Sequence, residues 1–346
     1  MDIVTRELIN KREHDVLCSQ ASFSDESAGR ARTTTKDFLR NDFQRDRDKI
    51  LHSKAFRRLS HKTQVFLAVE GDHFRTRLTH TLEVSQIART IARGLGLNED
   101  LTEAIALGHD LGHTPFGHGG ERALSYCIAR ARGLDVQDPA NEDLFKHNEQ
   151  SIRVVEHLEN AGKGLSLTPE VKDGILHHTG HVRASSMEGR IVATADRIAY
   201  VNHDIDDAIR AGLLCESDIP QNIKTTIGSH HADRIETLVL DMVHTSAALG
   251  DIALSEEMWS AMNELRAFLF ENVYRAPSVA AEVEKARRII EQLFAYYIEH
   301  LDEIPDEYKT LAQDDIQAVV DYIACMSDRY AITVFERIFI PTPVIG

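Results

Sequence analysis

The stretch AIALGHDLGHTPFGHGGE, residues 104–121, joins an apolar helical pattern to a group of histidine and acidic residues. The apolar run 104–107 is typical of the buried face of a helix, and it leads directly into His109 and Asp110. A histidine beside an aspartate at the end of an apolar helix is costly to bury unless something compensates, and a divalent cation is the usual compensation. The stretch therefore predicts a helical protein with a metal site where a helix ends.

The rest of the chain continues the helical pattern. Apolar residues recur at three- and four-residue spacing through most of the 346 residues, and only 8 prolines are present, so we predict an all-α fold. Asn98 is the expected N-cap of a helix that Gly112 ends, and residues 63–73 suggest a small hairpin or an extended loop. The expected helices cover residues 42–60, 77–94, 99–111, 119–131, 143–160, 168–178, 187–211, 221–248, 255–273, 278–301 and 313–328.

The length slightly exceeds what one hydrophobic core usually supports, so we expect a catalytic domain with an extension. Residues 1–41 form an N-terminal segment, with one helix before residue 24 and a mobile polar loop over 25–41. Residues 42–212 hold the motif-rich domain. Residues 213–346 have few paired polar motifs and are expected to be a helical C-terminal extension.

The net charge of the chain limits the classes of ligand that we expect it to bind. The chain has 39 Lys+Arg and 55 Asp+Glu, a net charge of −16, which argues against coating nucleic acid or anionic lipid by bulk electrostatics. Residues 30–77, however, contain 13 Lys/Arg and only 6 Asp/Glu. Because this basic segment ends three residues before His80, we expect a small polyanion to bind more readily than a long nucleic acid.

The cysteines and the chain start indicate the compartment. Cys18, Cys127, Cys215 and Cys325 are far apart, so neither a disulfide framework nor a cysteine zinc site is expected. Charged residues occupy the start where a signal peptide needs an apolar region, and no uncharged apolar run approaches the ~18 residues of a membrane span. We therefore expect a cytoplasmic protein that does not associate with membranes.

Histidines carry most of the chemistry. Thirteen of the 18 lie between His52 and His203, and most of them are expected to be ordinary surface or core residues. The exception is His109 with Asp110, for which His80 lies about one helix earlier and Asp196 later. Imidazole nitrogen and carboxylate oxygen together suit Mn²⁺, Fe²⁺, Co²⁺, Ni²⁺ or Mg²⁺, and such a set leaves positions open for water and a phosphate oxygen.

His118 and Glu121 are spaced i and i+3 at the start of a helix that opens with Gly117, so both project from one face. A carboxylate partner orients the imidazole and raises its pKa, which suits protonation of a leaving alkoxide. An ordinary surface histidine with a nearby glutamate is the alternative interpretation.

Helical spacing also groups possible substrate contacts. Arg77 lies three residues before His80 and shares its face, so its guanidinium could reach phosphates. Asp196, Tyr200 and Asp204 are spaced i, i+4 and i+8 and form one stripe. A core tyrosine with a capping or solvated carboxylate would produce the same stripe.

The strings TRLTHTLEV (76–84), HDLGHTPFGHGGE (109–121) and ADRIAYVNHD (195–204) resemble the HD-domain metal-dependent phosphohydrolases, specifically the bacterial deoxyguanosinetriphosphate triphosphohydrolase (dGTPase)-like proteins. The similarity begins near FQRDRDKILHSKAFRRL (43–59), extends to about residue 207, and continues more weakly over 321–331. It implies an all-α, multi-helical HD-domain fold, with the HD domain over 42–212.

The resemblance also implies roles for individual residues. The metal ligands would be His80, His109, Asp110 and Asp196. The catalytic residues would be His118, Glu121, His113 at the α-phosphate, and His147 as a second active-site histidine. The substrate contacts would be Arg77, Arg197, Tyr200, Asp204 and Gln64. After FRRL, relatives commonly have a glutamine near the sugar or base; here Ser60 follows, and Gln64 is four residues further on, which leaves the base preference open.

The implied reaction is metal-dependent hydrolysis of 2′-deoxynucleoside 5′-triphosphates, dGTP or several dNTPs, to deoxynucleoside and inorganic triphosphate. The alternatives are another HD phosphohydrolase, such as a deoxynucleoside monophosphate phosphatase, or a regulator that binds dNTP or nucleic acid. The resemblance implies a homo-oligomer with a dNTP substrate, and it allows a dNTP effector and weak binding of single-stranded DNA.

Overall fold

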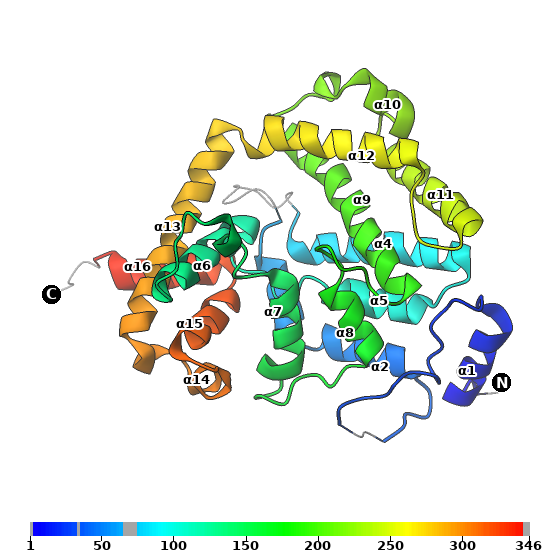
Figure 1. The fold of residues 1–346 in the computed structure, drawn as a ribbon, viewed down its shortest axis with the longest axis horizontal. Helices are drawn as coiled ribbons and strands as arrows, with labels where there is room; N and C mark the ends of the chain where they lie inside the picture. Colours follow the sequence, from blue (N-terminus) through cyan, green and yellow to red (C-terminus); the bar gives the residue numbers. More distant parts are fainter. Residues whose placement is uncertain (1–2, 33–34, 65–74, 342–346) are drawn as a thin grey trace. The chain divides into compact units, whose positions relative to one another are not determined.

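The computed structural model describes residues 3–32, 35–64 and 75–341. Within these ranges the chain forms sixteen α-helices linked by turns and short 3₁₀ and π segments, and the one β-type pairing is the isolated bridge between Thr63 and Thr76 (Figure 1). The predicted all-α fold is confirmed. The hairpin expected over 63–73 lies almost entirely outside the described residues. None of the described helices has the length and apolar character that crossing a membrane requires.

The chain folds into two units, and each unit combines three separate segments. The first unit contains Met1–Ser53, Thr79–His109 and Leu165–Ala276, and the second contains Lys54–Leu78, Asp110–Gly164 and Pro277–Gly346. The peptide bond between His109 and Asp110 is one point where the chain passes from the first unit to the second. The division at residues 41 and 212 stays a prediction.

The first unit is built around α5 and α9. Its helices are α1 (Arg6–Val16), α2 (Asp42–Leu51), most of α4 (Arg77–Leu95), α5 (Glu99–Gly108), α8 (Pro169–Leu176), α9 (Met187–Arg210), α10 (Gln221–Ile227), α11 (His231–Leu249) and α12 (Glu256–Leu269). Helix α5 packs against α2, α8 and α9, and α9 also packs against α11 and α12 (Figure 1). The fully buried side chains Ile50, Leu101, Ile105, Ile175 and Ile191 belong to this core.

Two glycines bring α5 and α8 close together. A Cβ atom at Gly108 would lie 2.5 Å from Ile175 Cδ1, and one at Gly174 would lie 2.4 Å from Ile105 Cδ1. Both distances are too short for a side chain, so each helix uses a glycine to admit an isoleucine from the other. Since Gly108 directly precedes His109, this packing fixes the end of α5 that carries the histidine.

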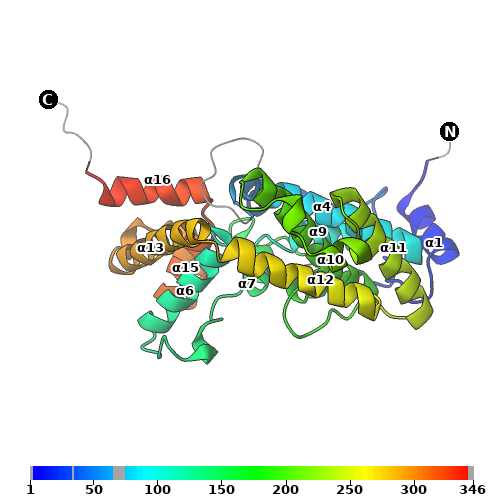
Figure 2. The same cartoon turned by 90° about the horizontal axis from the view of Figure 1, so that it is seen from above.

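The second unit is centred on α13. Its helices are α3 (Lys54–Arg58), α6 (Gly117–Ala131), α7 (His147–Arg153), α13 (Pro277–Glu299), α14 (Asp306–Leu311), α15 (Asp315–Ala324) and α16 (Asp328–Phe339). Helix α13 packs against α6, α15 and α16 (Figure 2). Buried side chains from these helices form a continuous apolar cluster that includes Leu124, Ile290, Leu293, Val319 and Ile323.

The predicted start of α5 is confirmed. The Asn98 side-chain oxygen accepts hydrogen bonds from the backbone N–H groups of Asp100 at 3.0 Å and Leu101 at 3.2 Å, as an N-cap does. The predicted end is wrong, because α5 stops at Gly108 and not at Gly112. His109 and Asp110 therefore lie just beyond the helix.

Two predicted helices are interrupted, and a third starts later than predicted. The helix expected over 42–60 ends at Leu51 and restarts as α3, where the Glu159 carboxylate caps the new helix by accepting from the N–H groups of Lys54 and Ala55. The helix expected over 221–248 is split into α10 and α11 at Gly228, whose φ of +108° no helix tolerates. The helix expected over 143–160 begins only at α7 and ends in a π segment, Val154–Leu158.

The C-terminal prediction also needs correction. Residues 313–328 do not form one helix, because α15 ends at Ala324 and a further helix, α16, starts at Asp328 with Ser327 as its N-cap. Helix α14 was not predicted either. The buried Asp321 of α15 also forms an ion pair at 2.5 Å with Arg153, a residue outside the predicted C-terminal extension, which the sequence did not indicate.

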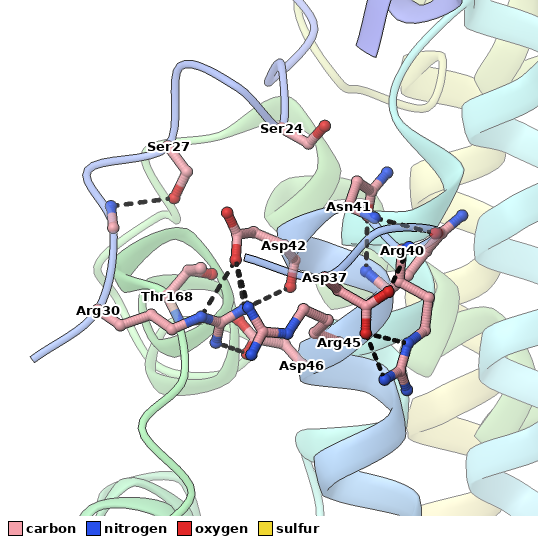
Figure 3. Close-up of polar contacts among 12 residues, drawn as sticks. Ser24, Ser27, Arg30, Asp37, Arg40, Asn41, Asp42, Arg45, Asp46 and Thr168 are labelled. Carbon is pink, nitrogen blue, oxygen red and sulfur yellow. Dashed lines mark hydrogen bonds and ion pairs between the residues drawn. The ribbon is translucent and has the colours of Figure 1, made fainter. Parts of the chain in front are cut away.

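Much of the basic segment is neutralised by ion pairs within the first unit (Figure 3). Arg30, with 4% of its side chain exposed, is paired with Asp42 at 2.9 Å and with the fully buried Asp46, whose second carboxylate oxygen accepts from Thr168 N at 2.7 Å. Arg40 is paired with Asp37 at 2.7 Å, on the surface. These cations stabilise the fold. The count of Lys and Arg in residues 30–77 therefore overestimates the positive charge that is available to a phosphate ligand.

Candidate active site

In the first unit, three of the predicted metal ligands come together. His80 lies on α4, His109 directly follows α5, and Asp196 lies on α9. His80 Nε2 is 3.0 Å from Asp196 Oδ1, and His109 Nε2 is 3.9 Å from the same oxygen. Both histidines are buried, whereas 21% of the Asp196 side chain is exposed. The arrangement directs two imidazole rings at one partly accessible carboxylate.

The donor atoms of this group fit a divalent cation. His109 Nδ1 lies 2.7 Å from Ala106 O, and a carbonyl oxygen only accepts, so Nδ1 carries the proton. In the neutral ring, Nε2 then presents a lone pair toward the side where Asp196 lies. Nitrogen and oxygen donors of this kind bind first-row divalent metals or Mg²⁺. We name His80, His109 and Asp196 the HHD group.

Asp110, the fourth predicted ligand, has partners of its own in the second unit. Its Oδ2 accepts a hydrogen bond from Arg77 Nη1 at 2.9 Å, and its Oδ1 is 3.3 Å from His113 Nε2. All three residues are buried. Arg77, predicted to reach phosphates, therefore pairs with this carboxylate. A role for Asp110 as a metal ligand stays a prediction, and its covalent link to His109 is what favours it.

Glu121 joins two histidines in the second unit, as the spacing on α6 predicted for one of them. Its Oε2 lies 2.6 Å from His118 Nδ1, and its Oε1 lies 2.7 Å from His147 Nδ1 and accepts from His147 N at 2.9 Å. The His147 ring stacks on His113 at 3.9 Å between centroids. His118 has 70% of its side chain exposed, so Glu121 holds one accessible and one largely buried imidazole.

Burial and charge shift the pKa values of this group in different directions. Burial would raise the pKa of Glu121, but the neighbouring His147 and His113 and the two hydrogen bonds from imidazoles hold it well below its ordinary value. Burial would lower the pKa of His147, but the charge and hydrogen bond of Glu121 raise it overall. Burial and the Arg77 charge lower the pKa of His113, which stays neutral at neutral pH.

The loop between His109 and α6 is held by residues that the sequence analysis did not single out. Lys62 Nζ donates to the carbonyl oxygens of His113 and, at 2.9 Å, Ala324. Asp328, at the start of α16, accepts from Phe116 N at 3.0 Å. Phe116 has a φ of +63°, which is uncommon for a residue with a side chain, so the loop depends on these contacts for its shape.

Asp328 also binds Thr63, the residue directly after Lys62. Its Oδ2 accepts from Thr63 N at 2.9 Å and from Thr63 Oγ1 at 2.6 Å. The C-terminal part of the chain thus fixes the segment that carries His113. Asp328 falls in the weakly similar stretch 321–331, but no sequence signal gave it or Lys62 a role, because their partners lie far away in sequence.

The predicted substrate residues occupy different surroundings. The Arg197 guanidinium lies 5.3 Å from the ring centre of Trp259, the single tryptophan. Tyr200 is half-buried, and burial raises its pKa to about 12. Asp204 is buried, with His203 and Tyr274 as partners. Gln64, in the second unit, has a buried side-chain oxygen that accepts no hydrogen bond within the described part of the chain.

Comparison with known protein families shows which class of protein the chain belongs to. The HD domain family matches residues 77–201, and the family described as phosphohydrolase-associated domain matches residues 252–337. The first match contains the HHD group, Asp110 and the Glu121 contacts. The second contains Asp328. The chain is therefore an HD-domain phosphohydrolase with an associated domain, and HD domains are metal-dependent.

Close relatives narrow the class. The chain is 53% identical to a deoxyguanosinetriphosphate triphosphohydrolase-like protein of Caldanaerobacter subterraneus subsp. tengcongensis, over 98% of this chain and 96% of the relative. Proteins with the same description from Clostridium tetani and Desulfatibacillum aliphaticivorans are 44% and 47% identical, each over 98% of this chain and 97% and 99% of the relative. The chain belongs to the deoxyguanosinetriphosphate triphosphohydrolase-like family.

Among solved structures, a hypothetical protein from Aquifex aeolicus aligns with a TM-score of 0.46 and 21% identity, over 85% of this chain and 71% of that chain.

Proposed function

We propose that the protein hydrolyses 2′-deoxynucleoside 5′-triphosphates at the α-phosphorus and releases deoxynucleoside and inorganic triphosphate. The observation that carries the proposal is the contact of His118 with Glu121 at 2.6 Å, in a chain that also holds the HHD group. A protein that only senses a nucleotide has no need of a positioned proton donor in addition to a metal site. The description of the relatives supports the choice of a nucleoside triphosphate.

The cation would be held by the HHD group and by Asp110, which directly follows His109 in the chain. When bound, it would polarise the phosphate and lower the pKa of a bound water. The chain's own residues would do the rest. As the water oxygen bonds to the α-phosphorus, the bond to the 5′-oxygen breaks. His118, oriented through Nδ1 by Glu121, would give its Nε2 proton to that oxygen. The proton of the water passes to solvent.

Positive charge for the triphosphate would come from Arg197 and from His147, whose pKa is raised beside Glu121. Tyr200 and Asp204, from the same helix α9, are the proposed sugar contacts. Arg77 would position Asp110, with which it forms a hydrogen bond. His113, which lies beside Asp110 and whose pKa is lowered, would contact the α-phosphate as a neutral ring. Gln64, whose side-chain oxygen accepts no hydrogen bond from the described residues, is the proposed contact to the sugar or base.

His118→Ala tests the assigned proton donor. We expect metal content and thermal stability to match those of the unsubstituted protein while triphosphate release falls by about 100-fold or more, the usual range of acid catalysis. His157→Ala, which removes an exposed histidine of the second unit, is the matched control and is expected to retain activity. Near-normal turnover by the His118 variant would exclude the assigned role.

Product analysis tests the reaction itself. Purified, metal-analysed protein is incubated separately with each dNTP, each NTP and each deoxynucleoside monophosphate, and the anions are resolved by ion exchange. Free triphosphate from a dNTP is the expected product, because only cleavage at the α-phosphorus releases it. Phosphate from monophosphates would instead identify a phosphatase, and intact dNTP bound with Mn²⁺ would identify a regulator.

A further inference from the structure

A chain of hydrogen bonds leads from Tyr274 to His80. Tyr274 ends the π segment Phe270–Tyr274, and its hydroxyl donates to Asp204 Oδ2. Asp204 Oδ1 lies 3.0 Å from His203 Nδ1, and His203 Nε2 lies 2.9 Å from His80 Nδ1. His80, His203 and Asp204 are each at most 2% exposed, so water does not compete for the two bonds among them, and the bond from Tyr274 is partly buried. All four residues belong to the first unit.

The chemistry of the groups fixes the direction of each bond. An ionised carboxylate only accepts, so Tyr274 donates to Asp204, and His203 donates to it through Nδ1–H. A neutral His203 then has a lone pair on Nε2, which can only accept. The bond at 2.9 Å therefore requires a proton on His80 Nδ1. The remaining nitrogen of a neutral His80, Nε2, is left with a lone pair.

That lone pair is the one 3.0 Å from Asp196 Oδ1. Without the hydrogen-bond chain, the other tautomer would be favoured, because an Nε2–H group could donate to Asp196 at this distance and would block both atoms as metal ligands. With the chain in place, the other tautomer would set the lone pairs of His80 Nδ1 and His203 Nε2 against each other. The buried contacts thus select the tautomer that binds a cation.

We propose that His203 and Tyr274 are positioning residues for the metal site: acting through Asp204, they hold His80 as the Nδ1–H tautomer, with Nε2 directed at Asp196. The proposal rests on the metal site of the proposed function but not on the substrate. Because both Asp204 oxygens take part, it also assigns to this carboxylate a role in metal binding that is separate from its predicted contact with the sugar.

The first test is Mn²⁺ affinity in the absence of nucleotide, measured by the EPR signal of free Mn²⁺ during titration of the full-length protein. His203→Leu is expected to bind Mn²⁺ about 10- to 100-fold more weakly, the usual effect of losing a partner of a ligand histidine. His203→Gln is expected to restore affinity to within about threefold, because its amide can accept from His80 and donate to Asp204. A merely structural role would not separate these two variants.

Tyr274→Phe provides a second variant should His203→Leu fail to fold. It removes one hydroxyl and is expected to weaken Mn²⁺ binding by about two- to tenfold, less than His203→Leu, because it lies further along the hydrogen-bond chain. Tyr296→Phe is the matched control: it removes a hydroxyl bonded to Glu303 at 2.6 Å in the second unit and is expected to leave the affinity unchanged. Equal affinities of the Tyr274 and Tyr296 variants would contradict the proposal.

The second test reads the tautomer directly from long-range ¹⁵N NMR of the histidine rings, with metal removed. The His80 signals are assigned by comparison with a His80→Gln sample. In the unsubstituted protein we expect His80 as the Nδ1–H tautomer. In Tyr274→Phe and in His203→Leu we expect a larger fraction of the Nε2–H tautomer. An Nε2–H ring in the unsubstituted protein, or unchanged Mn²⁺ affinity in His203→Leu, would overturn the proposal. Neither measurement uses a nucleotide, so a failure of the predicted dNTP hydrolysis leaves them interpretable.

Discussion

A buried guanidinium needs compensating carboxylates, and Arg30 has two of them, Asp42 and Asp46 (Figure 3). The Asp46 side chain has no exposed area, so removing Arg30 would leave a buried carboxylate with fewer partners. Arg40 also makes two ion pairs, with Asp37 and Asp48, but 47% of its side chain is exposed. Burial, not the number of contacts, separates the two arginines.

We therefore expect Arg30→Ala to lower the free energy of unfolding by about 3–5 kcal/mol, and Arg40→Ala to lower it by at most about 1 kcal/mol. Urea unfolding followed by circular dichroism measures both, with the unsubstituted protein as the reference. Equal losses in the two variants would show that Asp46 finds another partner when Arg30 is absent.

Sequence reasoning at this scale identified residues whose neighbours are close in the chain. His118 and Glu121 are three residues apart on one helix, and their contact was predicted from that spacing. Lys62 and Tyr274 were missed, because their partners lie far away in the sequence and no periodic pattern connects them. His203 stood directly before Asp204, but the spacing of α9 alone does not show that its ring reaches His80.

At the scale of elements, the loop before α6 depends on a lysine side chain that is removed from water. Lys62 is 2% exposed, and burial, together with the Arg58 charge, lowers its pKa from the ordinary 10.5 to about 7. Between these two values the unfolded chain binds a proton that the folded chain does not. The free energy of unfolding therefore rises with pH from about 7 toward 10.5, since the slope follows the protons bound by the unfolded state.

We expect Lys62→Met to remove this rise. The test compares urea midpoints at several pH values between 7 and 9 for Lys62→Met, the unsubstituted protein and Lys11→Met, which alters an exposed lysine of α1. The unsubstituted protein and the Lys11 variant should gain stability over this range relative to Lys62→Met. Parallel curves for all three proteins would mean that Lys62 keeps its charge when buried.

The elements themselves were predicted where local chemistry determines them. Asn98 caps α5 as its position indicated, and most helices occur where apolar spacing placed them. The predictions failed at breaks set by tertiary contacts, such as the one before α3, where Glu159 supplies the cap from more than one hundred positions away. At Gly228 a local signal existed, and its importance was underestimated.

At the scale of the whole molecule, the HHD group draws its three ligands from α4, the end of α5 and α9. A cation bound by these residues would stabilise the folded chain over the unfolded one, because the unfolded chain cannot bring the three ligands together. Their wide separation in sequence is what makes this coupling strong.

We expect Mn²⁺ at 100 times its dissociation constant to raise the free energy of unfolding by about 2.7 kcal/mol. His80→Ala should lose this gain, whereas His244→Ala, which removes an exposed histidine of α11, should keep it. Differential scanning calorimetry with and without Mn²⁺ measures the shift. An equal shift in both variants would place the stabilising metal elsewhere.

The fold class followed from apolar periodicity, but the arrangement of the chain in two interleaved units did not. Periodicity reports which face of a helix is buried, not which other helix covers it. The segment 110–164, for example, leaves the first unit directly after His109, and the sequence there shows no linker composition. The boundary falls within the motif itself.

This interleaving constrains how the protein can be made. As the chain leaves the ribosome, the first unit acquires its last segment only when Ala276 has emerged, and the second unit must wait for Pro277–Gly346. Until then, the apolar face of α6 lacks α13, its main packing partner. Nascent chains of this topology expose core surface for longer than chains whose domains finish one after another. Rapid translation of the span between α6 and α13, or chaperone protection during it, would therefore limit aggregation.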